Sequence, residues 1–260
     1  VVVLYPDGRV SPRQAHQLGC LGGNIRTLRV SGSFDDCQAM VKQALNDADL
    51  QARVPLSSAN SISLGRLLPQ MAYYAHAALA HQAAQDALLN VVVPTGNLGN
   101  AMAAVMARAL GVPLGRIVLA TNANRVLPDY FGGGPYQARA SVATLANAMD
   151  VGAPSNFERL RWLYAGDDAV LRGQFVARAV PHTAAAVRVL EQLRASGEAA
   201  AHEHWAVVAT AHPAKFEAVV EPLIGCEVPV PPALAELLRR PAHAEPCAPE
   251  YAALRDTLLR

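Results

Sequence analysis

The segment with the clearest chemical signature is VVVPTGNLGN, at residues 91–100. An apolar, β-branched run leads into a loop with glycines at 96 and 99, and a helical pattern follows. Glycine lets a ligand approach the backbone closely, and amide N–H groups at the start of a helix attract anions. Thr95, Asn97 and Asn100 add side-chain donors. The segment predicts a phosphate-binding loop, with a tight strand-to-helix turn as the plainer alternative. Its glycine spacing is not that of nucleoside-triphosphate or dinucleotide sites.

A second candidate anion site lies in ANSISLGR, at residues 59–66. Asn60 and Ser61 can donate hydrogen bonds at the start of the helix that follows. Arg66, one to two turns further on, carries a planar guanidinium group suited to phosphate oxygens. The alternative is that Asn60 and Ser61 only cap the helix and that Arg66 lies on its surface.

Other reactive residues show no comparable pattern. The two imidazoles of His202-Glu203-His204 have no third ligand at metal spacing, so we expect no metal site. No nucleophile-elbow motif supports a hydrolase. The only lysines are Lys42 and Lys215, and neither adjoins a candidate site. The four cysteines are far apart, which predicts free thiols: Cys20, Cys37, Cys226 and Cys247.

Short apolar runs alternate with longer helical patterns along the chain. Strands are predicted at 1–5, 24–30, 89–93, 117–121 and 205–210, and helices at 11–19, 33–45, from about 64 onward, and at 100–110, 156–164, 183–197 and 213–223. This alternation predicts an α/β protein with mostly parallel sheets. A boundary near 85–90 would separate a small α/β domain (1–88) from a larger one (89–260). The proline-rich tail predicts a loose segment before a last short helix.

Bulk composition narrows the class of protein. With 260 residues, 52% of them hydrophobic, the chain can bury a sizeable core. A net charge of +1 gives no reason to expect nucleic acid or an anionic membrane as a partner. No apolar run reaches the roughly 18–20 residues that span a bilayer, and no signal peptide is visible. We therefore expect a cytoplasmic protein. Because the sequence begins inside a strand pattern without methionine, we also expect an N-terminal part to be missing.

Seven segments resemble threonine synthase and follow that family's order and spacing, from residue 4 to residue 216. They are LYPDGRVSPRQ, GGNIRTLRVSGSFDDCQAMVK, LSSANSISLGRLLPQMAYY, PTGNLGN, ATNANRVL, AMDVGAPSNFERL and ATAHPAKF. The resemblance implies the fold-type II architecture of pyridoxal phosphate enzymes, with helices on both faces of two mostly parallel sheets. It also implies a lyase of threonine biosynthesis that converts O-phospho-L-homoserine and water to L-threonine and phosphate.

The resemblance assigns roles to individual residues. Substrate phosphate would be bound by Asn60, Ser61 and Arg66, and the hydroxyl of Thr210, at a strand end, would meet the pyridine nitrogen. The cofactor phosphate would be bound by Thr95, Gly96, Asn97, Leu98, Gly99 and Asn100.

The chain also departs from the family pattern. The family's catalytic lysine lies in a Phe-Lys-Asp motif upstream of LYPDGRVSP, so this chain alone is predicted to be inactive. Leu98 stands where relatives commonly have phenylalanine, Ser63 replaces an asparagine, and Arg125 replaces an acidic residue. A non-catalytic protein that binds phosphate or the cofactor is the main alternative, and another lyase or deaminase of the same class is a third. A monomer or a homodimer is expected.

Overall fold

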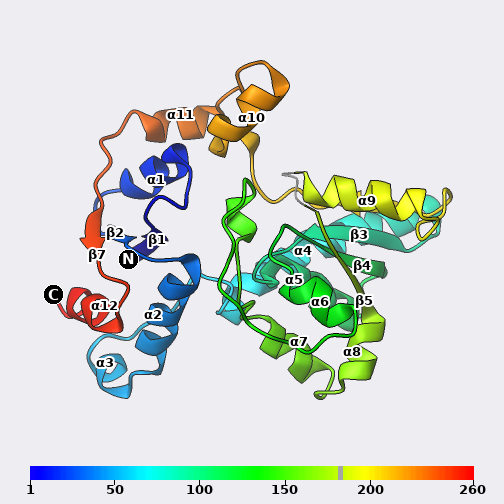
Figure 1. The fold of residues 1–260 in the computed structure, drawn as a ribbon, viewed down its shortest axis with the longest axis horizontal. Coiled ribbons are helices and arrows are strands. Elements are labelled where there is room, and N and C mark those ends of the chain that lie inside the picture. Colours follow the sequence, from blue (N-terminus) through cyan, green and yellow to red (C-terminus); the bar gives the residue numbers. More distant parts are fainter. Residues whose placement is uncertain (181–183) are drawn as a thin grey trace. The chain divides into compact units, whose positions relative to one another are not determined.

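The structure is a computed structural model that describes residues 1–180 and 184–260. The chain forms two compact units: Val1–Ser57 together with Ala211–Arg260, and Ser58–Thr210 between them in sequence (Figure 1). This division differs from the predicted one, which placed a single boundary between residues 88 and 89. The chain leaves the first unit earlier than expected and returns to it, because its last strand pairs with a strand near the N-terminus.

The first unit is built on a three-stranded parallel sheet of order β1-β2-β7. Leu4 of β1 lies opposite Leu28 of β2, and Val30 of β2 lies opposite Cys247 of β7. The strands are β1 (Val2–Pro6), β2 (Arg26–Val30) and β7 (Glu245–Cys247). The helices are α1 (Pro12–Gly19), α2 (Phe34–Asn46), α3 (Ala48–Arg53), α10 (Glu217–Ile224), α11 (Pro232–Leu238) and α12 (Tyr251–Leu258), with a 3₁₀ turn at Pro213–Lys215.

Local sequence signals explain where the early helices of this unit begin. Ser11 and Gln14 form a reciprocal capping box at α1, and Ser33 and Asp36 form one at α2. A core then gathers from β2, β7 and the helices α2, α3 and α12: Leu28, Val30, Met40, Leu50, Cys247 and Leu254.

The prediction of a loose tail was wrong, because α11 and β7 both lie within it. Pro246 fits in β7 because this strand is at the edge of its sheet, where a missing N–H group is tolerated.

The second unit is built on a four-stranded parallel sheet of order β5-β4-β3-β6. Its strands are β3 (Leu89–Pro94), β4 (Leu114–Thr121), β5 (Phe175–Ala179) and β6 (Trp205–Val207). Its helices are α4 (Leu64–Gln85), α5 (Gly99–Ala109), α6 (Val126–Phe131), α7 (Phe157–Leu163), α8 (Asp168–Gln174) and α9 (Ala185–Ala195), with a 3₁₀ turn at Asn147–Met149. Residue 183, where the last of these helices was predicted to begin, lies outside the described residues.

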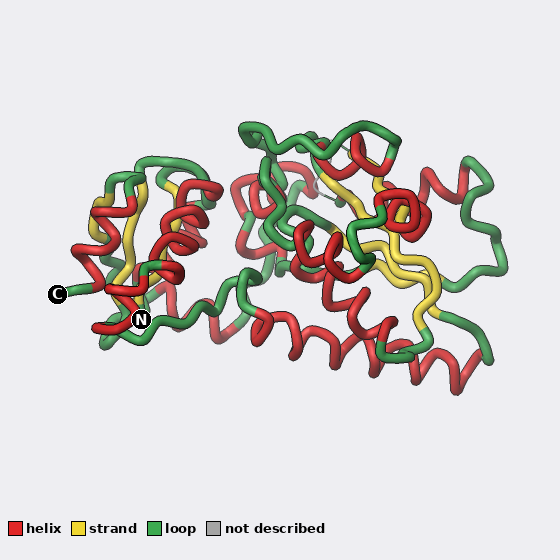
Figure 2. Tube along the Cα trace, turned by 90° about the horizontal axis from the view of Figure 1, so that it is seen from below, coloured by secondary structure: helices red, strands yellow, loops and turns green. Residues whose placement is uncertain are grey.

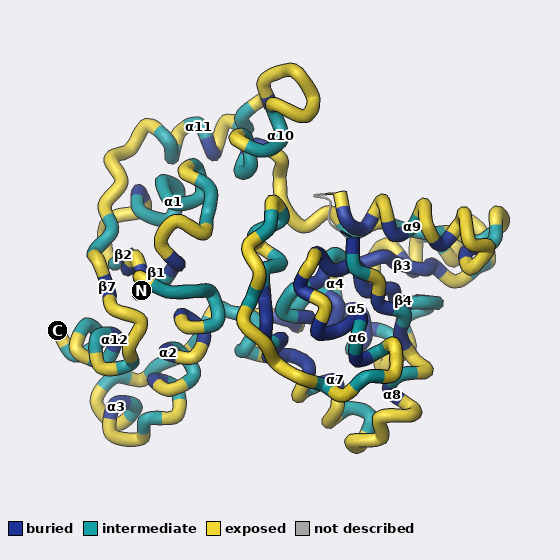
Figure 3. The backbone as a smooth tube through the Cα atoms, viewed as in Figure 1, coloured by how far each residue is buried: buried dark blue, intermediate teal, exposed yellow. Residues whose placement is uncertain are grey.

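Both faces of this sheet are covered, which explains the unbroken apolar runs of β3 and β4. Val91 and Val93 belong to the core that includes α4 and α5, whereas Val92 packs with Ala186 and Val189 of α9. Figure 2 shows the strands with helices on either side, and Figure 3 shows β3 and β4 as buried. The expected α/β class with parallel sheets is therefore confirmed.

Among the described helices, none combines the length and the hydropathy needed to cross a bilayer.

Candidate functional site

The predicted phosphate loop, residues 95–98, connects β3 to α5. Thr95 is buried, its amide donates to the carbonyl of Ala120 at 2.7 Å, and its hydroxyl donates to the carbonyl of Val93 at 2.8 Å. Its side chain was expected to offer a donor to a ligand. The structure uses that donor to fix the start of the loop.

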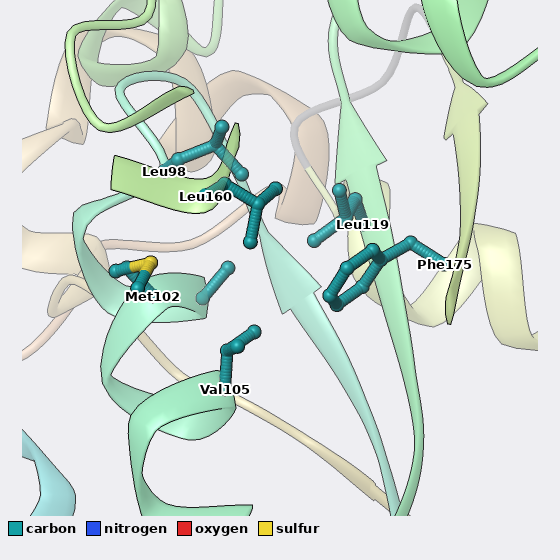
Figure 4. A pocket seen from close by; sticks show the side chains of 7 residues that line it. Leu98, Met102, Val105, Leu119, Leu160 and Phe175 are labelled. Atoms are coloured by element: carbon teal, nitrogen blue, oxygen red, sulfur yellow. The ribbon is translucent and has the colours of Figure 1, made fainter. Parts of the chain in front are cut away.

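Leu98 anchors the other end of the loop. Its φ of 61° lies in the left-handed region, which a leucine rarely adopts, and its side chain is buried. Figure 4 shows this side chain converging with those of Met102, Leu119 and Leu160 in an apolar hollow between α5, β4 and α7. The hollow offers a ligand no polar partner, so we interpret it as the core behind the loop. Packing in this core turns the backbone of the loop outward.

The backbone amides of the loop are the available donors. Those of Gly96, Asn97 and Leu98 donate to no acceptor among the described residues. The amides of Gly99 and Asn100 open the 11-residue helix α5, where no intrahelical acceptor precedes them. Together they form a positive cradle at a helix N-terminus, at the carboxyl edge of a parallel sheet, where ligands of α/β proteins bind.

Asn97 ties the loop to two other segments. Its Nδ2 donates to Ser61 Oγ at 2.7 Å, and its Oδ1 accepts from the amide and the hydroxyl of Ser155 at 2.7 and 2.9 Å. Its carbonyl accepts from Asn156 Nδ2 at 2.9 Å. The amide side chain that was expected to contact phosphate thus holds the cradle together.

Asn100 is engaged by a pair of tyrosines on α4. Tyr74 donates its hydroxyl to Asn100 Oδ1, while Asn100 Nδ2 donates to the hydroxyl of Tyr73. Burial raises the pKa of the Tyr74 phenol. Burial also raises the pKa of the Tyr73 phenol, although the hydrogen bond with Asn100 and the nearby charge of Arg66 lower it in part. Both phenols therefore stay protonated at neutral pH.

This pair was not among the predicted site residues. The available signal was the spacing of Arg66 and Tyr73, which are two helical turns apart on one face of α4.

The second predicted anion site lies directly beside the loop. The amide of Ser63 donates to the carbonyl of Asn60 at 2.9 Å, closing a turn at residues 60–63, and Asn60 Oδ1 accepts from the amide of Ile62 at 3.3 Å. Helix α4 begins at Leu64, so Asn60 and Ser61 do not cap it. Arg66 is exposed, and its side chain makes no hydrogen bond or ion pair with any described residue. Its guanidinium group is thus available to an anion.

Arg159, on α7, was missed by sequence analysis. Its guanidinium donates to the carbonyl of Ser61 at 2.8 Å, to the carbonyl of Ile62, and to Asn156 Oδ1 at 2.5 Å. These contacts fix the turn at residues 60–63.

A third segment, which contains Met149 and Val151, packs against the loop at Gly96. A Cβ atom at this position would lie 2.8 Å from the Cα of Met149, so only glycine fits. Asp150 holds that segment in place: it accepts from Asn122 Nδ2 at 2.7 Å and from the amide and hydroxyl of Thr144 at 2.9 and 2.7 Å.

The remaining predicted residues are placed as follows. Thr210 is exposed just beyond β6, whose pairing with β3 continues through a hydrogen bond from the amide of Val208 to the carbonyl of Val92. Lys42 lies on α2 and Lys215 in a 3₁₀ turn, both in the first unit. Arg125 pairs with Asp129 at 3.2 Å. No cluster of metal-ligating side chains occurs among the described residues.

Comparisons with known proteins find relatives of this chain. Residues 183–258 match the family described as "Threonine synthase, C-terminal". Threonine synthase of Serratia marcescens is 39% identical over 279 residues, and that of Escherichia coli is 37% identical over 278 residues. Each match covers 100% of this chain and 64% of the relative, so the chain spans less than two thirds of their length.

Solved structures give the same result. The crystal structure of threonine synthase from Escherichia coli matches with a TM-score of 0.90 and 36% identity, covering 100% of this chain and 64% of that one. The structure of PLP-bound threonine synthase from Brucella melitensis matches with a TM-score of 0.79 and 31% identity, covering 99% and 64%. On sequence and fold together, the chain is similar over its whole length to threonine synthases.

Proposed function

We propose that this chain contributes the phosphate-binding parts of a pyridoxal-phosphate-dependent threonine synthase, a lyase that converts O-phospho-L-homoserine and water to L-threonine and phosphate. The observation that carries the proposal is the cradle of unpaired amides at Gly96, Asn97 and Leu98, beside a second segment with an available guanidinium group at Arg66. Two adjoining anion sites are what a phosphorylated cofactor and a phosphorylated substrate require.

The residues present fit the cofactor's phosphate. The donors are backbone amides, which match the oxygens of a phosphate monoester, and the helix dipole of α5 adds to their field. When bound, pyridoxal phosphate supplies an electron sink for carbanion chemistry. Thr210 would offer a neutral hydroxyl to the pyridine nitrogen, so the nitrogen would not be forced to keep a proton.

The residues of the second site would act on the substrate. Ser61 and Asn60 would position the phosphate of the substrate, and the guanidinium of Arg66 would bind its oxygens. Because negative charge grows on that phosphate as it leaves, Arg66 would stabilise the transition state as well as the bound substrate. Tyr73, with its protonated phenol near Arg66, would border the same site.

A lysine outside these 260 residues would hold the cofactor covalently, since Lys42 and Lys215 each match a family segment other than its lysine-bearing motif. This chain alone should therefore show no turnover. A cytoplasmic location belongs to the same proposal, and a monomer or a homodimer stays a prediction.

The test is phosphate release from O-phospho-L-homoserine by a protein that carries this chain together with the lysine-bearing segment of its family. We expect release and the absorbance of lysine-bound cofactor. Substituting Arg66→Met should lower kcat/KM by at least about tenfold, equivalent to about 1.4 kcal/mol of lost transition-state binding, and Arg66→Lys should lower it less. Bound cofactor without any phosphate release would contradict the lyase and favour the non-catalytic alternative.

A further inference from the structure

The two proposed anion sites are physically joined. Asn97 of the loop donates to Ser61 of the turn at 2.7 Å. A Cβ atom on Gly99 would lie 2.7 Å from the Cβ of Ser61, so the backbone at Gly99 packs directly against the side chain of Ser61. Any movement of the turn at residues 60–63 must therefore displace the loop at residues 95–98.

Arg159 controls the position of that turn. Its Nη1 and Nη2 atoms donate to protein acceptors, namely the carbonyls of Ser61 and Ile62 and the side-chain oxygen of Asn156. Asn156 is fully buried and donates in turn to the carbonyl of Asn97. One half-buried guanidinium group thus holds the turn directly and holds the loop through a single intermediate.

We propose that Arg159 is a positioning residue that couples the two phosphate sites, by holding the turn at residues 60–63 against the loop at residues 95–98. A phosphate bound at either site would order the shared contacts, so that the second phosphate meets a site already ordered. Such coupling is reciprocal: each ligand tightens the binding of the other by the same factor. This inference rests on the proposed function, because it names the two ligands of the same sites.

The experiment measures that factor without turnover. Binding of pyridoxal phosphate to the full protein is titrated with and without butyl phosphonate. This compound carries a phosphonate in place of the phosphate of the substrate, and it has no amine that could react with the cofactor. In the wild type we expect butyl phosphonate to tighten cofactor binding at least about fivefold, within the usual range of allosteric coupling. Occupation of the cofactor's own phosphate site by butyl phosphonate would weaken cofactor binding instead.

The variant Arg159→Gln should reduce the coupling factor to near one while cofactor still binds at high concentration. Arg159→Lys, which keeps the charge but cannot span two carbonyls and an amide, should give an intermediate factor. The matched control is Arg161→Gln on the same helix, where an exposed arginine pairs with Asp168 at 3.4 Å. It should leave the factor unchanged. Thermal unfolding of each variant shows whether the fold is kept.

Several results would overturn the inference: no positive coupling in the wild type, the same factor in Arg159→Gln as in the wild type, or loss of the factor in Arg161→Gln. Should Arg159→Gln fail to fold, a wild-type factor in Arg159→Lys would overturn it as well. Phosphate release by the wild type is measured in parallel. Coupling without release would contradict the proposed reaction and leave the role of Arg159 standing, whereas release without coupling would do the reverse.

Discussion

Gly99 packs against Ser61 where the two candidate anion sites meet, and no backbone strain is involved, since its φ is not positive. Substitution Gly99→Ala should push Ser61 away and cost about 1–3 kcal/mol of stability, the usual cost of an extra methyl group in close packing. It should also weaken binding at both sites. Denaturant unfolding and phosphate release measure the two effects.

A matched control is Gly65→Ala. A Cβ there would meet only Ser63 Oγ, at 3.6 Å, an ordinary contact. Because the position is helical, alanine should leave stability equal or slightly higher. Equal losses in both variants would show that close packing at Gly99 is not the cause.

Cys37 gives a second prediction for a single side chain. Burial, aided by the charge of Asp36 and by Cys247, raises the pKa of the Cys37 thiol to about 12. Iodoacetamide at pH 8 should therefore label the exposed Cys226 first and reach Cys37 only after unfolding. Mass spectrometry of the labelled peptides decides the order, and early labelling of Cys37 would contradict the burial argument.

The same shift has a consequence for stability. The folded state holds the thiol proton more tightly than the unfolded chain, whose thiol has a pKa of about 8.5. The contribution of Cys37 is present in full below that pH and is lost as the pH rises toward about 12. In Cys37→Ala this part of the alkaline decline should disappear, as measured by denaturant unfolding between pH 7 and 10.5.

At the scale of elements, the position of the segment that packs against Gly96 depends on the hydrogen bonds of Asp150. Substitution Asp150→Ala removes one of three acceptors of the fully buried Asn122 and leaves the amide of Thr144 without its acceptor. An unsatisfied buried donor costs about 1–3 kcal/mol, so the segment should open. We expect faster trypsin cleavage after the exposed Arg139, followed by gel electrophoresis. Asp256→Ala, at an exposed position on α12, is the control and should cleave like the wild type.

The elements of the site could largely be predicted from sequence, because β3 and β4 are buried on both faces and so contain the apolar runs 91–93 and 117–120. Strands β5 and β7 could not: β5 contains the exposed Arg178, and β7 has three residues including a proline. Whether such short runs form strands is decided by their neighbours in the sheet.

Within the site, the glycines and the helix start predicted the amide cradle. The hydrogen bonds from Arg159 to the turn at residues 60–63 could not be predicted, because its partners at Ser61 and Ile62 are backbone carbonyls, which every residue type possesses. The use of Asn97 as a tie was likewise hidden, since an asparagine can donate to a ligand or to a neighbouring segment.

At the scale of the whole molecule, the first unit is assembled from the two ends of the chain. Substitution Leu28→Ala in β2 should cost about 2–5 kcal/mol and destabilise residues 1–57 and 211–260 together. Leu119→Ala in β4 should act on residues 58–210 instead. Hydrogen exchange followed by mass spectrometry locates each effect. A response of residues 1–88 as one block would favour the contiguous division predicted from sequence.

The pairing of β2 with β7 cannot form until both strands have been synthesised. Leu28 meets Glu245, and at about 5–20 residues per second the ribosome needs roughly 10–40 seconds to cover that interval. Throughout that time one border of β2 presents unpaired amides and carbonyls to other nascent chains. Chaperone protection during this interval should therefore matter more to the yield of this protein than to that of one whose paired strands are synthesised close together.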